Sequence, residues 1–141
     1  MSELTAQLDL PLGVDASAAA RHAIMAVLGG WGFRDERWLA AAAVVVSELV
    51  TNAVRHGGGA VAFTVESHDE QVVLCVADGS SVVPRHRDPD DVGGRGLAVI
   101  EALSTGWGVR DHQGGKQVWV RLKPYPGPLP THPGTGREGA A

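Results

Sequence analysis

The fold and the chemistry of this chain are decided by the stretch Ser47-Glu48-Leu49-Val50-Thr51-Asn52-Ala53-Val54-Arg55-His56-Gly57. Its spacing predicts a helix on which Glu48 and Asn52, four residues apart, project from the same face. An amide oxygen can hold a magnesium ion, and a carboxylate beside it can orient or deprotonate an attacking oxygen. The pair indicates phosphoryl transfer, and a solvated polar stripe on the helix is the alternative.

The region before residue 60 has the apolar spacing of helices. The predicted elements there are, in order, an extended segment from Gln7 to Leu12, a helix from Ala16 to about Leu28 and a helix from near Asp35 to His56. Asp15 is the expected N-cap of the first helix, and Gly29-Gly30 is its expected end. Gly57-Gly58-Gly59 stops the second helix.

Beyond residue 60 the apolar period changes to that of strands. The predicted elements are strands at Val61–Val65 and Gln71–Ala77, a short helix at Leu97–Leu103, and strands at Trp107–Arg110 and Gln117–Leu122. Residues 67–70 are expected to join the first two strands as a hairpin. The segment Ser80–Gly94 is rich in proline, glycine and charge, so it cannot form a regular element, and loops of this length are often lids.

Length and composition limit the classes of function. The chain has 141 residues, 44% hydrophobic and 20% charged, which suits one domain, placed at residues 1–123 with a disordered tail at 124–141. The net charge of -4 gives no drive toward nucleic acid or an anionic membrane. Cys75 is the only cysteine and is expected in the core. Because neither a signal-peptide pattern nor a membrane-length apolar stretch is present, we expect a cytoplasmic protein.

Two further motifs could join the helix pair in one site. Asp78-Gly79 follows a strand directly, and a buried aspartate there could accept a hydrogen bond from an exocyclic amine such as that of adenine; a turn is the alternative. Gly93-Gly94-Arg95-Gly96 precedes the predicted third helix, so its backbone N–H groups could form a nest for phosphates. A glycine-rich hinge without a ligand is the alternative there.

In this order the motifs resemble those of the GHKL ATP-binding superfamily, and within it the small bacterial anti-sigma-factor serine kinases. The similarity runs from about Leu8 to Leu122. Its N-box is Glu48 with the run from Asn52 to Gly57, and its two glycine boxes are Asp78-Gly79 and Gly93 to Leu97. The resemblance implies an α/β two-layer sandwich of the Bergerat type, with a mixed sheet and about three helices on one face.

The resemblance also implies roles for individual residues. Asn52 would bind magnesium, Asp78 and Gly79 would contact adenine, and Glu48 would act as general base toward a protein serine hydroxyl. The ATP phosphates would be lined by Gly94, Arg95, Gly96 and Leu97.

The implied function is that of an ATP-dependent serine/threonine protein kinase, which phosphorylates a small antagonist protein, can sequester a sigma factor and is expected to form a homodimer. The alternative is a non-catalytic module that regulates through protein contacts, with ATP structural or absent. Glu48 favours the enzyme, since a nucleotide binder has less need of a carboxylate beside the metal-binding amide. Ser81, which stands where the family's first glycine box has its second glycine, favours the binder. A third alternative is an α/β domain without nucleotide.

Overall fold

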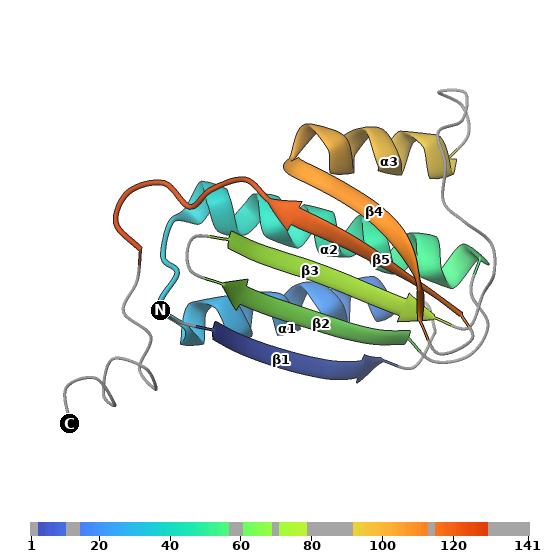
Figure 1. Ribbon diagram of the computed structural model, residues 1–141, viewed down its shortest axis with the longest axis horizontal. Helices are drawn as coiled ribbons and strands as arrows, with labels where there is room; N and C mark the ends of the chain where they lie inside the picture. Colours follow the sequence, from blue (N-terminus) through green and yellow to red (C-terminus); the bar gives the residue numbers. More distant parts are fainter. Residues whose placement is uncertain are drawn as a thin grey trace.

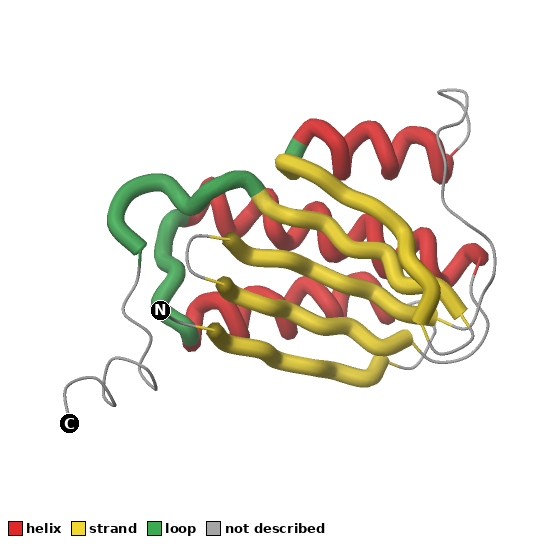
Figure 2. The backbone as a smooth tube through the Cα atoms, viewed as in Figure 1, coloured by secondary structure: helices red, strands yellow, loops and turns green. Residues whose placement is uncertain are grey.

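The computed structural model describes residues 3–10, 15–56, 61–68, 71–78, 92–112 and 115–129, which form a sheet with helices on one side (Figure 1). The strands are β1 (Glu3–Leu10), β2 (Val61–His68), β3 (Gln71–Asp78), β4 (Ser104–His112) and β5 (Gly115–Leu122). The helices are α1 (Ala16–Gly30), α2 (Glu36–His56) and α3 (Val92–Ala102). Figure 2 shows the strand layer and the helix layer, which confirm the predicted two-layer α/β sandwich.

The sheet has the strand order β1-β2-β3-β5-β4, and each of these neighbouring pairs is antiparallel. The expectation of a mixed sheet is therefore wrong for the described strands. The helix α3 does join two strands that run in the same direction, β3 and β4. However, β5 lies between them and is antiparallel to both, so no two parallel strands are neighbours.

The hydrophobic core lies between the sheet and the helices. Strand residues alternate between the two faces of the sheet, and the helix-facing set is buried: Phe63, Val65, Leu74, Val76 and Val120. The helices contribute, among others, Ile24, Leu28, Val46, Val50, Leu97 and Ile100 to the same cluster. Each fully buried side chain of this size contributes about 1.5–3 kcal/mol relative to exposure, so this layer holds the two-layer fold together.

The ends of α1 and α2 follow from their caps. The Oδ1 atom of Asp35 accepts a hydrogen bond of 2.8 Å from the N–H of Trp38, so this carboxylate caps α2 and fixes its predicted start. Asp15 precedes α1 as predicted, but its side chain forms no capping hydrogen bond. Helix α1 also continues through Gly29 and Gly30, and the chain turns away at Gly32, whose φ of 103° favours glycine.

Helix α3 starts five residues earlier than predicted, at Val92 instead of Leu97. The three glycines between these positions have low helix propensity, which is why the sequence pattern places them before the helix. The buried side chains of Leu97 and Ile100 anchor α3 in the core, and this packing outweighs the propensity of its first turn. Residues 80–91 of the predicted lid lie outside the described residues.

The chain after β5 packs against the start of α2, beyond the domain boundary placed at residue 123. The hydroxyl of Tyr125 accepts hydrogen bonds from the backbone N–H groups of Arg34 and Asp35, both at 2.8 Å. Its ring contacts Phe33 and Trp38 edge-on, with centroids 5.0 Å apart in both pairs. Tyr125 is therefore not part of a disordered tail, whereas residues 130–141 lie outside the described part and the tail there stays a prediction.

Two smaller expectations concern burial and membranes. Cys75 is only 1% exposed, as expected of a small core residue. Within the described part of the chain, no helix combines the length and apolar character that crossing a bilayer requires.

Candidate functional site

The fold brings the elements that carry the three predicted motifs to one end of the molecule. Helix α2 ends there, β3 ends there with Asp78 as its last residue, and α3 begins there (Figure 1). Helix α2 contacts both α3 and β3. Gly79 lies outside the described residues, so its predicted role stays untested.

Asn52 is buried on α2, and Glu48 lies one turn before it. The Asn52 side chain is only 8% exposed, and Asn52 and Ser67 are the two buried polar residues in the described part of the chain. Glu48 is half-buried. A buried carboxamide is costly unless it finds polar partners, so Asn52 is not a member of a solvated stripe. Its burial favours a residue that holds a ligand or supports one.

Polar contacts with α1 fix the rotation of α2 about its axis. The hydroxyls of Ser17 and Thr51 are 2.9 Å apart, and the guanidinium of Arg21 donates a hydrogen bond of 3.1 Å to the Ser47 hydroxyl. Ser47 and Thr51 each immediately precede one residue of the Glu48 and Asn52 pair, and they face α1. Successive helix residues are about 100° apart around the helix axis. Glu48 and Asn52 therefore point away from the side of α2 that contacts α1.

These four polar residues were not predicted from the sequence. The two polar residues on each helix are four positions apart. This spacing indicates that they share one face of their helix, but it does not identify the helix against which that face packs.

The start of α3 provides the second part of the site. The first backbone N–H groups of an α-helix have no intrahelical acceptor, and Val92, Gly93 and Gly94 occupy this first turn. Glycine has no Cβ, so an anion can approach these N–H groups closely.

The remaining residues of the second glycine box lie further along α3. Gly96 and Leu97 are one turn into the helix, and the Leu97 side chain is 1% exposed in the core. The Leu97 side chain therefore anchors the helix in the core, and the predicted contact of Leu97 with the phosphates stays a prediction. Arg95 is in the helix, and the contacts of its side chain stay a prediction.

The donor atoms at this end of the molecule fit a magnesium ion that is shared with phosphates. Mg²⁺ prefers oxygen ligands and is usually held by one or two protein side chains together with substrate phosphates and water. The amide of Asn52 would supply such an oxygen, and the carboxylate of Glu48 lies one helical turn before it. Among the described residues, no group of three or more His, Cys, Asp or Glu side chains could hold a metal. The residues present fit a magnesium ion that arrives with a nucleotide.

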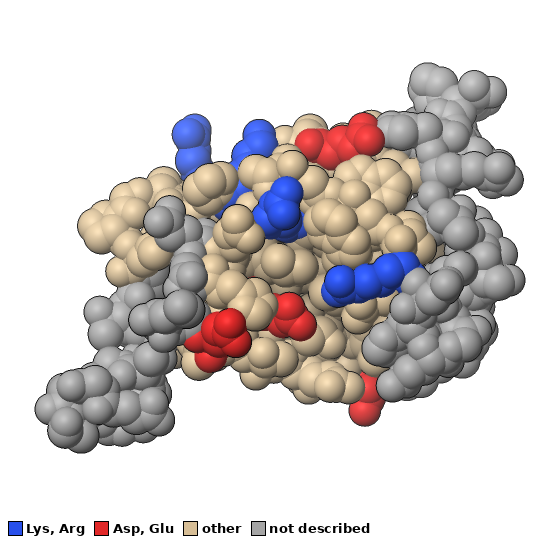
Figure 3. Space-filling view, viewed as in Figure 1, with Lys and Arg blue, Asp and Glu red and all other residues tan. Residues whose placement is uncertain are grey.

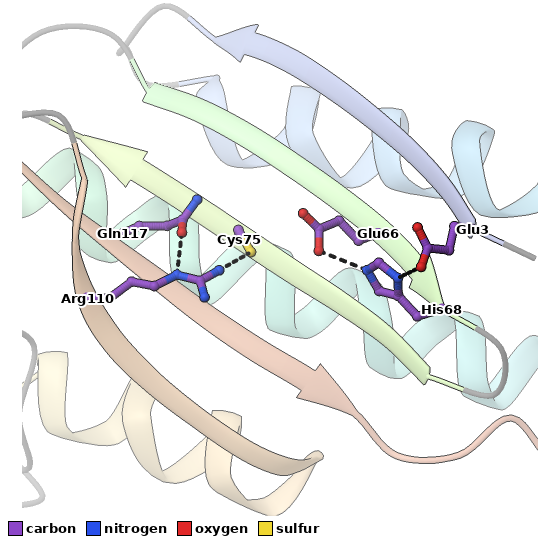
Figure 4. A network of polar contacts seen from close by, with 6 residues as sticks. All are labelled: Glu3, Glu66, His68, Cys75, Arg110 and Gln117. Atoms are coloured by element: carbon purple, nitrogen blue, oxygen red, sulfur yellow. Dashed lines mark hydrogen bonds and ion pairs between the residues drawn. The ribbon is translucent and has the colours of Figure 1, made fainter.

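A second polar network lies on the opposite face of the sheet (Figure 4). The ring of His68 contacts Glu66 at 3.1 Å and Glu3 at 3.4 Å. The hydrogen bond to Glu66 raises the pKa of His68, with smaller contributions from Glu3 and partial opposition from burial. Burial raises the pKa of the Cys75 thiol, which accepts a contact of 3.8 Å from Arg110. A thiol with a raised pKa is a poor nucleophile, so no covalent catalysis is assigned to this face.

Comparison with known proteins agrees with the motif order. The family model of the histidine kinase-like ATPase domain matches residues 10–122. No curated protein matches the chain. A solved structure of the RsbU and RsbW domains of Rv1364c from Mycobacterium tuberculosis aligns with a TM-score of 0.63 and 23% identity, over 91% of this chain and 34% of that one.

Two histidine kinases are also similar in fold. The histidine kinase domain of the Erythrobacter litoralis EL346 blue-light activated histidine kinase aligns with a TM-score of 0.52 and 20% identity, over 79% of this chain and 60% of that one. The Acinetobacter baumannii histidine kinase AdeS aligns with a TM-score of 0.51 and 13% identity, over 85% and 68%. The chain spans about a third of the mycobacterial structure and less than two thirds of the Erythrobacter one.

Proposed function

This chain belongs to the histidine kinase-like ATPase family, and we propose that it is an ATP-binding regulator of the anti-sigma kind. The observation that carries the proposal is the burial of the Asn52 carboxamide one turn from Glu48, at the end of the molecule where β3 ends and α3 begins. A helix start with glycines suits phosphates, a buried amide oxygen suits their magnesium ion, and a carboxylate one turn away suits proton transfer.

The proposal assigns a role to each predicted site residue. Asn52 would hold the magnesium ion, and Asp78 and Gly79 would contact the adenine. Gly94 lies in the first turn of α3, where backbone N–H groups have no intrahelical acceptor and could bind phosphate, and Arg95 would add a positive charge near them. Gly96 and Leu97 would complete the segment that lines the phosphates, and the buried Leu97 side chain would keep α3 in place. When bound, magnesium supplies positive charge against the phosphate oxygens.

The proposed reaction is transfer of the terminal phosphoryl group to a serine or threonine hydroxyl of a small antagonist protein. The hydroxyl oxygen forms the new bond to phosphorus, the bond to the bridging oxygen of ADP breaks, and Glu48 accepts the hydroxyl proton. Because Glu48 is only half-buried, a hydroxyl on another protein could reach it. A sigma factor is the second proposed partner, which the same surface would sequester.

The test is a transfer assay with radiolabelled ATP, magnesium and a soluble extract of the organism that encodes the chain. We expect label on serine or threonine of a small protein with the wild-type chain, and loss of that label with Glu48→Ala. The same variant should bind ATP nearly as well as wild type, because the Glu48 carboxylate is proposed to act on the serine or threonine hydroxyl and not on the nucleotide. Glu36→Ala, which removes an exposed carboxylate from the first turn of α2, is the matched control and should transfer normally. Loss of ATP binding in Glu48→Ala would contradict the role proposed for that residue.

A second candidate function is a non-catalytic binding module. Ser81, in place of the second glycine of the first box, is the observation that favours it. This candidate predicts a chain that captures its protein partner with no label transfer, and whose capture is unchanged in Glu48→Ala.

A further inference from the structure

The sheet face that points away from the helices carries a basic patch on β4 and β5, which takes no part in the proposed nucleotide site. No helix of the described chain covers this face (Figure 1). In Figure 3 the sheet lies toward the viewer, and the marked side chains are acidic over β1 and β2 and basic over β4 and β5. The basic patch consists of Arg110, Trp119 and Arg121, and each of these residues is exposed or half-buried.

Two glycines give the Trp119 ring its place at the centre of the basic patch. Gly106 and Gly108 occupy successive positions on this face of β4, and Gly108 pairs with Trp119 of β5. A Cβ atom on Gly108 would lie 2.8 to 2.9 Å from three atoms of the indole, so the ring stands face-on to this glycine. Because the glycines have no side chain to displace it, the ring lies flat across β4 and stays half-buried.

Each arginine of the basic patch is held through its Nε atom. Arg110 Nε donates a hydrogen bond of 2.6 Å to Gln117 (Figure 4). Arg121 Nε donates one of 2.9 Å to the hydroxyl of Thr105, the extra residue where the β4 register shifts. One terminal nitrogen of Arg110 contacts the Cys75 sulfur at 3.8 Å, a weak acceptor. The guanidinium groups are thus oriented in advance, with terminal N–H groups left for a second partner.

The described chain supplies no carboxylate to either arginine. Neither Arg110 nor Arg121 forms an ion pair with a described residue. Arg121 instead lies over the Trp119 ring, with its Cζ atom 5.9 Å from the ring centroid, in a cation–π contact. Arginine and tryptophan are among the residue types that contribute most binding energy at protein interfaces. The basic patch therefore presents two oriented positive charges and an apolar ring to a partner from outside the described chain.

The spacing of the two charges matches an extended peptide. Arg110 pairs with Gln117, which is four residues from Arg121 along β5. Four residues of strand span roughly 13 Å, and Trp119 lies midway along this distance. In an extended peptide, the side chains of residues i, i+2 and i+4 point to one side with the same spacing. A peptide with carboxylates at i and i+4 and an apolar residue at i+2 therefore matches all three residues of the basic patch.

We propose that the basic patch binds an extended acidic segment of another protein, with one carboxylate on Arg110, one on Arg121 and an apolar side chain on Trp119. The other half of the same face argues against a nucleic acid. Glu3 and Asp9 are exposed on β1, and they would repel a continuous polyanion that crossed the sheet. Because the basic patch lies on the face opposite the helices, this binding goes beyond the proposed function and does not require ATP.

Titration with a synthetic peptide, followed by nuclear magnetic resonance, tests the proposal. The probe is acetyl-Gly-Glu-Ser-Leu-Ser-Glu-Gly-amide, added without ATP to the isotope-labelled full-length chain. We expect saturable shifts confined to β4, β5 and their neighbour β3, with a dissociation constant below about 1 mM that rises with salt. A peptide of the same composition with its two glutamates adjacent should bind at least about threefold more weakly, because it reaches only one arginine at a time.

Charge-removing variants identify the residues that carry the binding. Arg110→Gln and Arg121→Gln should each raise the dissociation constant of the peptide about three- to fivefold. Arg121→Lys keeps the charge and should restore part of the lost affinity. Arg37→Gln removes an exposed arginine from α2 and should bind as wild type does. The amide spectrum of each variant reports whether it is folded, so a loss of binding through unfolding is recognised directly.

Three results would overturn the proposal. One is equal affinity in the wild type and both glutamine variants, or shifts that map away from the basic patch. Another is a single-stranded oligonucleotide that binds the basic patch more tightly than the peptide. The third is a second copy of the chain on this face, seen as shifts of the same amides when the free chain is diluted. Arg110→Gln and Arg121→Gln should bind ATP as wild type does, so ATP titration tests the proposed function independently.

Discussion

Removal of the Tyr125 side chain should destabilise the domain, although this residue lies in the segment that composition marks as a tail. Its hydroxyl accepts two backbone hydrogen bonds of 2.8 Å, and its ring stands edge-on to two aromatic rings at 5.0 Å. Tyr125→Phe removes the acceptor and should cost about 1–2 kcal/mol, since one of the two donors is only partly accessible to water. Tyr125→Ala also loses two aromatic pairs of about 0.5–1.5 kcal/mol each and part of the buried area, for a total of about 3 kcal/mol.

Thermal unfolding followed by circular dichroism measures these losses. For a domain of this size, 1 kcal/mol corresponds to roughly 3–5 °C in Tm, so we expect a fall of about 5 °C for Tyr125→Phe and about 10 °C for Tyr125→Ala. Leu129→Ala is the control, because Leu129 is 41% exposed near the end of the same segment and should change Tm by less than about 2 °C. A Tyr125→Ala variant that unfolds with the wild type would refute the packing of this segment against α2.

Four further substitutions test the sheet. Gly108→Ala would place a Cβ 2.8 Å from the indole nitrogen of Trp119 and should cost about 1–3 kcal/mol in urea unfolding. Gly106→Ala should cost less, because the nearest atom to its Cβ is the flexible end of Arg121 at 3.0 Å. The raised pKa of His68 means that its protonated form stabilises the fold, so His68→Gln should lower the free energy of unfolding by up to about 1 kcal/mol below pH 6. This loss should disappear as the pH rises above the folded pKa, and an equal loss at pH 5.5 and 8.5 would contradict the prediction. Ser67→Ala should raise stability by about 0.5–1 kcal/mol, since the buried hydroxyl has no hydrogen-bond partner among the described residues, and a lower Tm would show that it has one.

The elements that could be predicted from the sequence are those with strong local signals. Helix α2 carries a capping aspartate at its start and a long apolar period, and β3 is a continuous apolar run, so both were placed within one or two residues. The start of α3 was missed because its first turn is glycine-rich and is held in the helix by packing further along. The place of Tyr125 was missed because its partners lie some 90 residues away in sequence.

The residues of the candidate site also fall into two groups, those that a local sequence pattern predicts and those that it does not. Glu48 and Asn52 could be found from sequence because they share one helix face and one local motif. The contacts between α1 and α2 that orient them join residues 26 to 34 positions apart, and no local pattern reports such a pairing. The strand order β1-β2-β3-β5-β4 likewise becomes visible only once the strands are paired.

The most direct test of the proposed nucleotide site is calorimetric titration of the full-length chain with ATP in the presence and absence of magnesium, for wild type and Asn52→Ala. We expect saturable binding that requires magnesium, and a dissociation constant at least about tenfold higher for Asn52→Ala, equivalent to about 1.4 kcal/mol. Gln7→Ala, which removes an exposed amide from β1, should bind as wild type does. An absence of binding at about 1 mM ATP, or equal affinity in the Asn52→Ala variant, would contradict the account.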